Sequence, residues 1–526
     1  MSSNEKGNFK AVLLTAATIA IIIGSTFLIP KNLDLNFSFL NRFFKNVYEV
    51  KKASENLPAS TAPTESLEIS EIVELRQLLQ NEQYDRLNSL LEEYQNSFDK
   101  DQTDEYKVYD AYRTFSLTVS SYEDLIKKWI DTTPDKYQPY LAMAQFYYEN
   151  GWESRGYKSR KDTSGKQFEE MGYYFKKAEG NLKIALEMNP NLMIAYYTLI
   201  GIYNANGQDE LEDWVVEKTS ELFPHSFLIK AAISWVKEPR WGGRYEQMEL
   251  LANQAEQYSD INPKIPVLYG FIYSDQADNF KRNEKNEKAL ELYSKALRYG
   301  DYWSIYNERA KLYHYNLKSY DNALKDVNRS IELRSTVYEN HLMRSKINFA
   351  IKEYAESIKD MQTAETIKPK NSKIQKWKKW ASDTLLNRGH QIFKNDLEGA
   401  VDYYDLSLEY YKDSFQTYYW RGRALVNLKD FESALSDFKI AIEIDPRHYE
   451  SYLMVDYIYA QRKQWNEILS YWDKFIELEP DNADAYFERA GTHYHNKNME
   501  SSIKDLKSAC DLGNKKACQR YNMVKR

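Results

Sequence analysis

The sequence predicts an all-α protein, an α-solenoid of helical hairpins behind an N-terminal transmembrane helix. Three observations indicate this fold class. Residue types recur with a fixed period of one helical hairpin over 415–482, an uncharged apolar run occupies 11–30, and glycine and proline are sparse, at 18 and 13 of 526 residues. Both residues disfavour helix interiors, so their scarcity is typical of a helical chain. A chain of this length exceeds one compact core, whereas a repeat array grows in one dimension.

Residues 11–30 are expected to form a membrane anchor after a short tail at 1–10. The run is free of charged residues, and a helix of that length spans roughly 30 Å, the hydrocarbon thickness of a bilayer. The alternatives are a buried core helix and a cleaved signal peptide. A core helix would need neighbours on every face, and no small-residue cleavage site follows the run, where Phe27 to Lys31 stand instead. We therefore expect an uncleaved single-pass anchor.

The orientation of this anchor depends on its flanking charges and its short amino tail. The flanking basic residues are Lys6 and Lys10 before the run, and Lys31, Arg42 and Lys45 after it. This near balance means that the positive-inside rule decides little, and the short tail favours an amino terminus inside the cell. The expected localisation is a bacterial inner membrane, with the periplasmic or extracytoplasmic side favoured for the soluble body. Residues 31–66 combine an amphipathic stretch with a polar linker that contains proline.

Residues 67–262 are expected to form a helical domain of degenerate repeats. Leucines and tyrosines recur there at helical intervals, and Pro190 and Pro224 stand one repeat period apart. The same spacing continues through an array at 263–514, in which one block near Tyr306 carries an extra residue in its turn. A polar helix at 515–526 is expected to cap the array, because a solenoid needs a final helix without an exposed apolar face.

Two motifs in the first domain are candidates for a functional site. Trp152 and Arg155 stand before a basic loop, and Arg240 and Trp241 stand in a turn completed by two glycines. In the structural interpretation, the tryptophans fill space between helices while the arginines cap helix ends or pair with carboxylates. In the functional interpretation, the four residues line one pocket for a carboxylate or a peptide, because arginine offers a planar fork and tryptophan a ring face.

The array has the more regular spacing of the two regions. In the block from 415, Gly422 and Ala434 stand where two helices must approach closely, and Pro446 ends the second helix. The next proline, Pro480, occupies the equivalent position of the following block. A hairpin of this kind cannot bury its apolar faces alone, so neighbouring hairpins must stack.

This spacing resembles the tetratricopeptide repeat (TPR). The resemblance implies that first helices line a concave groove and bind a protein or peptide partner. The groove positions that it selects are Asn307, Lys311, Lys346, Tyr419, Arg423, Tyr457, Phe487 and Tyr494. The stretch from about 67 to 258 resembles a helical domain of unknown function in bacterial TPR-containing proteins, which implies no known chemistry.

Cys510 and Cys518 stand at the end of the last repeat and in the capping helix. Their spacing resembles a disulfide-bearing variant of the helical hairpin repeat in exported bacterial proteins. The resemblance implies a disulfide if the body lies outside the cytoplasm, where such bonds persist. Two buried thiols that act as small packing residues are the alternative for a cytoplasmic body.

Composition and motifs argue against several classes of function. The net charge of −7 lacks the basic footprint of a nucleic-acid-binding protein. A basic, linker-like run at 368–380 carries Trp377 and Trp380. It suggests either contact with nucleic acid or anionic lipid, or a helix whose lysines face solvent over packed tryptophans. The net charge favours the second interpretation, so we expect no nucleic-acid partner.

The sequence also lacks the motifs that assemble catalytic and metal sites. It contains no GxxxxGK, GxGxxG, HExxH or GxSxG. His493 and His495 are the closest histidine pair, and alternate residues on a helix point to different sides. We therefore expect a membrane-anchored, non-catalytic scaffold with no cofactor, no metal and no catalytic residue. The alternative is an envelope enzyme or regulatory subunit with a pocket around the Trp152 and Trp241 motifs.

Overall fold

The computed structural model describes residues 66–156 and 162–524. The expected tail, the anchor at 11–30 and nearly all of the juxtamembrane segment lie outside this part of the chain and stay predictions. The described helices belong to one compact unit, Thr61–Arg526. Among them, none combines the length and the apolar character that crossing a membrane requires.

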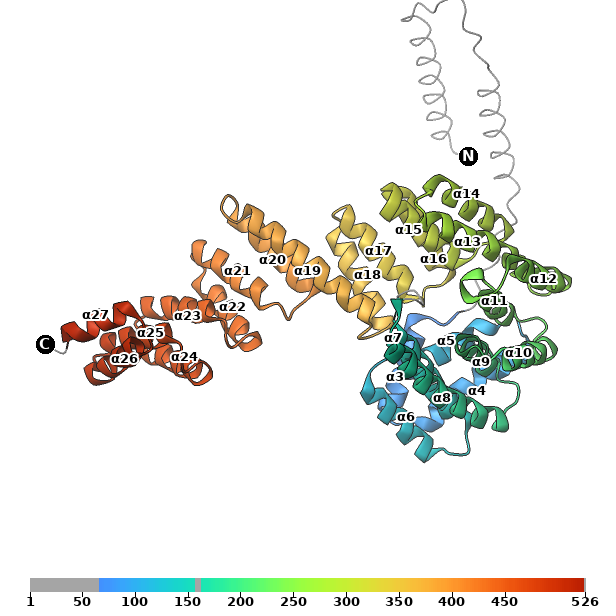
Figure 1. Ribbon diagram of the computed structural model, residues 1–526, viewed down its shortest axis with the longest axis horizontal. Coiled ribbons are helices and arrows are strands. Elements are labelled where there is room, and N and C mark those ends of the chain that lie inside the picture. Colours follow the sequence, from blue (N-terminus) through green and yellow to red (C-terminus); the bar gives the residue numbers. More distant parts are fainter. Residues whose placement is uncertain (1–65, 157–161, 525–526) are drawn as a thin grey trace, which may run out of the picture. The chain divides into compact units, whose positions relative to one another are not determined.

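The described residues form helices and contain no β-strand, which confirms the all-α prediction (Figure 1). The elements of the first region are α3 (Ile69–Gln80), α4 (Tyr84–Lys100), α5 (Glu105–Arg113), α6 (Ser120–Thr132), α7 (Tyr137–Arg155), α8 (Gly165–Met188), α9 (Met193–Asn206), α10 (Asp209–Leu222), α11 (Phe227–Val236), the 3-10 turn η2 (Pro239–Trp241), α12 (Tyr245–Ala255) and the 3-10 turn η3 (Glu256–Tyr258). Those of the array are α13 (Val267–Arg282), α14 (Asn286–Ala296), η4 (Leu297–Tyr299), α15 (Trp303–Lys311), η5 (Leu312–Leu317), α16 (Tyr320–Leu333), α17 (Tyr338–Ala350), α18 (Tyr354–Ile367), α19 (Ser372–Ile392), α20 (Leu397–Tyr410), α21 (Phe415–Asn427), α22 (Phe431–Ile444), α23 (Tyr449–Gln461), α24 (Trp465–Leu478), α25 (Ala483–His495), α26 (Met499–Asp511) and the capping helix α27 (Lys515–Val524).

Successive helices pack as hairpins, as Figure 1 shows for α13 with α14, α17 with α18 and α19 with α20. The small residues of the repeat pattern allow this close approach. A Cβ atom added to Gly422 of α21 would lie 2.8 Å from the ring of Phe438 on α22. Phe438 is fully buried and fills the space that the glycine leaves. The pairing of a small residue with an aromatic ring is therefore what holds the hairpin tight.

The turns between the two helices of a hairpin have an unexpected composition. Lys429, Lys463 and Lys497, which occupy the same position in three successive repeats, adopt left-handed backbone conformations with φ of 68°, 57° and 62°. The N–H of the residue after each lysine donates to the carbonyl five positions before it, at 2.9–3.0 Å. This is the Schellman arrangement, in which glycine is the usual occupant. The repeat pattern therefore also includes the turn, where a lysine adopts a strained left-handed conformation.

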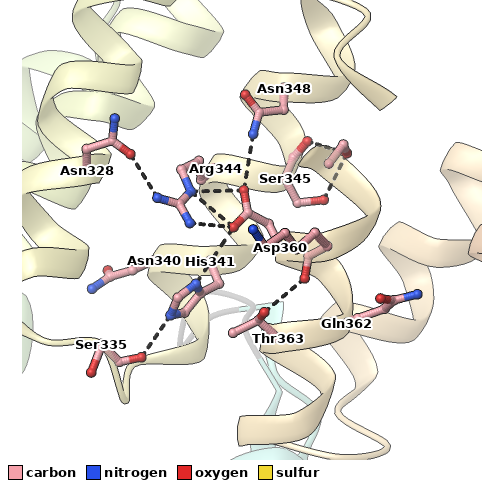
Figure 2. A network of polar contacts seen from close by, with 12 residues as sticks. Asn328, Ser335, Asn340, His341, Arg344, Ser345, Asn348, Asp360, Gln362 and Thr363 are labelled. Atoms are coloured by element: carbon pink, nitrogen blue, oxygen red, sulfur yellow. Dashed lines mark hydrogen bonds and ion pairs between the residues drawn. The ribbon is translucent and has the colours of Figure 1, made fainter. Parts of the chain in front are cut away.

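An arginine–aspartate pair joins the two helices of several hairpins. In Figure 2 the Arg344 guanidinium of α17 donates to both oxygens of Asp360 on α18, at 2.7–3.0 Å, and Asn348 donates to the same carboxylate. Arg344 also donates to Asn328 of the preceding helix α16, at 2.9 Å. The equivalent pairs are Arg309–Asp326, Arg421–Asp437 and Arg489–Asp505. The carboxylates of all four pairs are only 4–5% exposed, whereas the arginine side chains are 18–29% exposed. Each pair therefore connects neighbouring helices through a buried carboxylate.

Two stretches of the array differ from expectation. The extra residue of the block near Tyr306 does not lengthen the turn, because the first helix absorbs it as the π-helix η5. The basic run at 368–380 is not a linker, because α19 begins within it. Trp377 is buried and its indole N–H donates to Ser345 Oγ at 3.0 Å, whereas Trp380 stays 53% exposed and stacks on it at 5.0 Å.

The hydrophobic core is continuous across the expected boundary at 262/263. One cluster of buried side chains runs from Leu67 to Leu312. The two regions also meet through polar contacts. Arg334, just after α16, pairs with Asp110 of α5, and Lys368, just after α18, pairs with Glu149 of α7. These contacts bring α5 and α7 against the ends of two second helices of the array, and they frame a cavity.

Candidate functional site

A cavity of about 810 Å³ lies where the first region meets the array, and we call it the junction cavity. Its walls come mainly from first helices: α5, α7, α9, α11, α13, α15 and the start of α17 contribute, together with α3, η2 and the segments after α16 and α18. The volume falls within the range of small-molecule and peptide side-chain pockets. The sequence-predicted residues Trp152, Arg155, Arg240 and Trp241 all line it.

Three tryptophans form an aromatic cluster in this lining. The ring centroid of Trp152 lies 6.1 Å from that of Trp235 and 6.0 Å from that of Trp241, and the last two rings are 4.7 Å apart. The turn after η2 makes this contact possible, since a Cβ on Gly243 would lie 2.1 Å from the Lys237 carbonyl oxygen. Only glycine fits there. The predicted two-glycine turn therefore places Trp241 against α7 and α11.

The two arginines of the motifs have different surroundings. The Arg155 guanidinium lies over the rings of Trp152 and Trp241, at 5.9 and 5.8 Å from their centroids. Arg240 instead donates to Glu238, with Asp275 at 3.8 Å. Burial raises the pKa of Glu238 to about 7, although Arg240 acts in the opposite direction. Arg240 thus pairs with carboxylates, as the structural interpretation expected, while it also borders the cavity.

Arg113 of α5 is a cavity cation that no sequence motif singled out. The residue is accessible from the cavity although protein surrounds it, and its Nη1 donates to the Tyr109 hydroxyl at 2.7 Å. Tyr109 and the carboxylates Glu149 and Glu339 raise the pKa of Arg113 well above its ordinary value, against the effect of burial. An arginine in an ordinary amphipathic helix carries no local signal of this role, because the groups around it come from distant parts of the chain.

Other charged groups of the lining are engaged with one another. Arg334 pairs with Asp110, and the Thr336 hydroxyl donates to the same carboxylate at 3.0 Å. Arg76 of α3 donates to the backbone carbonyls of Thr366 and Ile367. These contacts close the wall of the cavity, although the buried Nε of Arg334 has no hydrogen-bond partner among the described residues.

Five groove positions predicted from the repeat lie on first helices near the C-terminus. Tyr457 of α23 and Tyr494 of α25 are 45% and 58% exposed. On α21, Arg423 lies over the ring of the neighbouring Trp420, 4.7 Å from its centroid, and 5.8 Å from that of Tyr419. Phe487 of α25 is half-buried. These side chains lie on the first helices of three successive repeats, and we call them together the aromatic row (Tyr419, Arg423, Tyr457, Phe487 and Tyr494).

The three predicted groove positions nearer the junction do not form an open surface. Asn307 is only 2% exposed, because its amide donates to Asn340 on the next first helix at 2.8 Å. Lys311 is half-buried and pairs with Glu308 at 2.6 Å. Lys346 lies 5.7 Å from the centroid of the Trp377 ring, and burial lowers its pKa to about 8. The groove assignment is wrong for Asn307, and the two lysines belong to internal networks.

Cys510 of α26 and Cys518 of α27 are joined by a disulfide. The bond links the last repeat to the capping helix. In residues 66–156 and 162–524, no group of three or more histidine, cysteine, aspartate or glutamate side chains is arranged to hold a metal ion.

Family models match three stretches of the chain. A domain of unknown function (DUF4034) matches residues 71–172, and tetratricopeptide repeat models match residues 415–448 and 463–517. Both resemblances seen in the sequence are thereby confirmed. The chain contains TPR repeats, and its N-terminal half contains a DUF4034 domain.

Individual proteins that are similar to the chain have only a low sequence identity to it. The small glutamine-rich tetratricopeptide repeat-containing protein 2 of Saccharomyces cerevisiae is 28% identical over 133 residues, which are 25% of this chain and 36% of that protein. The chain therefore spans about a third of that relative's length. Yeast Tom70 is 14% identical over 86% of this chain and 94% of its own, with a TM-score of 0.25. The TPR2AB domain of yeast Sti1, in a complex with pHSP90, is 17% identical over 44% of this chain and 98% of its own, with a TM-score of 0.21. Scores this low support no inference about the function of this chain.

Proposed function

We propose that the chain is a TPR scaffold that holds a protein or peptide partner against the first helices of its C-terminal array. The observation that carries the proposal is the aromatic row. Its members Tyr419, Arg423, Phe487 and Tyr494 lie within the segments that TPR models match, and Tyr457 lies between those two segments. Proteins of the TPR family are generally non-catalytic interaction scaffolds. The row is the part of the array where such an interaction has suitable side chains.

The composition of the aromatic row suits a binding surface. Tyrosine and arginine are enriched among the residues that carry most of the energy of protein interfaces. Tyr457 and Tyr494 keep about half of their surface in water, so a partner gains by covering them. Arg423 adds a cation held in place over the Trp420 ring, which lowers the entropy lost when it binds. Together they favour an extended partner with apolar side chains and an acidic group.

Site-specific photo-cross-linking in the full-length protein tests this function. A photoreactive residue at Tyr457 should capture a partner in cells, whereas the same residue at Glu477, exposed on the second helix α24, should not. Arg423→Glu should reduce the yield at Tyr457 about tenfold, since a reversed charge at a hot spot costs at least about 1.4 kcal/mol. Arg240→Ala, remote in sequence from the row, should leave the yield unchanged. Equal capture at Tyr457 and Glu477 would exclude the row as the docking surface.

We further propose that residues 11–30 anchor the scaffold in a bacterial inner membrane, with the body on the extracytoplasmic side. Two features support this localisation. The run 11–30 is uncharged and long enough to span a bilayer. The Cys510–Cys518 disulfide suits an oxidising compartment, where such bonds persist.

The alternative function, an envelope enzyme or a regulatory subunit, is favoured by the junction cavity. If the protein is an enzyme, Glu238 is the candidate for proton transfer, since a carboxylate with a pKa of about 7 is suited to that role. The Arg240 contact argues for a structural carboxylate instead. Glu238→Gln tests this alternative, because the isosteric amide abolishes proton transfer and keeps the shape of the site.

A further inference from the structure

We propose that the junction cavity is a second binding site, separate from the aromatic row, and that it takes a carboxylate carried by an apolar body. Arg113 is the group that receives the carboxylate, and the cluster of Trp152, Trp235 and Trp241 is the wall that covers the apolar body. The ligand that carries this carboxylate is either a peptide with a free carboxyl terminus or a small organic acid.

The first step of the argument is the state of Arg113. A guanidinium carries five N–H donors and favours bidentate contact with a carboxylate. Among the described residues, its hydrogen bond goes to a neutral phenol, that of Tyr109. The side chain is open to the cavity, although it is surrounded by protein. Its remaining donors therefore face a space that a ligand can enter.

The second step is the charge around Arg113. The carboxylates of Glu149 and Glu339 act on it electrostatically. Glu149 is held by Lys368, and Asp110 on the same helix is taken by Arg334 and Thr336. Glu339 of α17 also lines the cavity, but the hydrogen bond of Arg113 among the described residues goes to Tyr109 and not to this carboxylate. An anionic ligand would supply the missing partner at short range, where the interior strengthens the attraction.

The third step is the apolar wall. The tryptophan cluster presents ring surface to the cavity, and Arg155 lies over two of its rings. Anion receptor and aromatic wall therefore line one cavity of about 810 Å³, large enough for a short stretch of peptide.

The test uses matched acid and amide probes with the full-length protein in detergent. Binding of N-acetylphenylalanine, N-acetyl-Ala-Ala-Phe and their C-terminal amides is measured by tryptophan fluorescence and by calorimetry. We expect both acids to bind the wild-type protein about tenfold or more tightly than the corresponding amides, because a charge-assisted contact is lost with the carboxylate. Tighter binding of the tripeptide acid than of N-acetylphenylalanine identifies a peptide terminus as the source. Equal affinities of the two acids identify a small organic acid.

Variants connect this binding to Arg113. Arg113→Gln should abolish the difference between acid and amide, and Arg113→Lys should retain part of it, since lysine keeps the charge but not the fork. Arg423→Gln in the aromatic row should leave acid binding unchanged, which separates this site from the proposed docking surface. Two results would overturn the proposal: acids that bind the wild-type protein no better than amides, or an acid preference that survives Arg113→Gln in a folded protein.

Discussion

At the scale of single residues, the array contains arginine–aspartate pairs whose carboxylates are held away from water. Arg421 donates to Asp437 at 2.7–2.9 Å within its own hairpin and to Asp405 of the preceding helix at 2.6 Å. Asp437 is only 4% exposed. A buried carboxylate is tolerated only while its partner is present, because its desolvation is otherwise uncompensated. The pair therefore specifies how α21 and α22 meet more than it adds net stability.

We predict that Arg421→Ala destabilises the array by about 3–5 kcal/mol, because it leaves Asp437 buried without its cation. Chemical denaturation of the full-length protein, followed by circular dichroism, measures the change. The control is Arg86→Ala, which removes an exposed pair with Glu74 and should cost no more than about 1 kcal/mol. Similar losses for the two variants would contradict the assignment.

For the lysines in the hairpin turns, we expect a substitution that stabilises the protein. Lys463→Gly should stabilise the protein by about 0.5–1 kcal/mol, because glycine adopts the left-handed conformation without the cost that a Cβ brings. Ser470→Gly, at an exposed position inside α24, should destabilise it by a few tenths of a kcal/mol or more. Melting temperatures of the two variants should therefore move in opposite directions, and a fall for Lys463→Gly would show that the turn is unstrained.

At the scale of elements, the π-helix η5 places a histidine in an apolar environment. His314 is 8% exposed, its Nδ1 has no hydrogen-bond partner among the described residues, and burial lowers its pKa to about 4. The unfolded chain, with an ordinary histidine pKa of about 6.5, binds a proton more readily than the folded one. Stability linked to this group is therefore complete above about pH 6.5 and is lost as the pH falls towards 4.

We predict that His314→Gln flattens the fall in melting temperature between pH 7 and pH 4.5, since the substitution removes the group that must charge. His495→Gln, at an exposed position on α25, should keep the wild-type slope. Differential scanning fluorimetry at several pH values compares the three proteins. A wild-type slope in His314→Gln would assign the acid sensitivity to other groups.

The elements were also the part of the structure that the sequence predicted best. The hairpins follow from local spacing, since Gly422 and Phe438 are close in the chain and repeat in register. The burial of Asn307 was missed because its partner, Asn340, belongs to the next repeat, and an offset within one repeat cannot show it. The junction cavity was anticipated only in part. Trp152 and Trp241 stood out as motifs, whereas Trp235 did not, and the state of Arg113 depends on groups of other helices, such as Glu149 of α7.

At the scale of the whole described unit, contacts between Asp110 and Arg334 close the first region against the array. Both side chains are 4% exposed. Asp110→Ala should leave Arg334 buried without its counter-ion and cost about 3–5 kcal/mol. Hydrogen exchange should rise in α5 and in residues 334–339 and stay unchanged in α25 and α26. Uniform changes along the array would argue that the contact does not act locally.

The anchor proposal gives a prediction for the full-length protein in cells. It should sediment with membranes and be released by detergent, while high salt should leave it bound, because salt screens charges but does not weaken insertion into hydrocarbon. Deletion of residues 1–60 should move the protein to the soluble fraction. Release of the intact protein by salt alone would rule out the anchor.

The contacts that close the junction cavity also impose an order of events on biosynthesis. Arg76 finds its carbonyl partner at Thr366, 290 residues further along the chain. At a ribosome speed of about 5–20 residues per second, the nascent chain waits roughly 15–60 s for that partner to be made. During this interval the first helices emerge without the segments that complete their walls. We therefore expect that codon changes that slow synthesis of 260–370 lower the yield of the protein more than equal delays after 415.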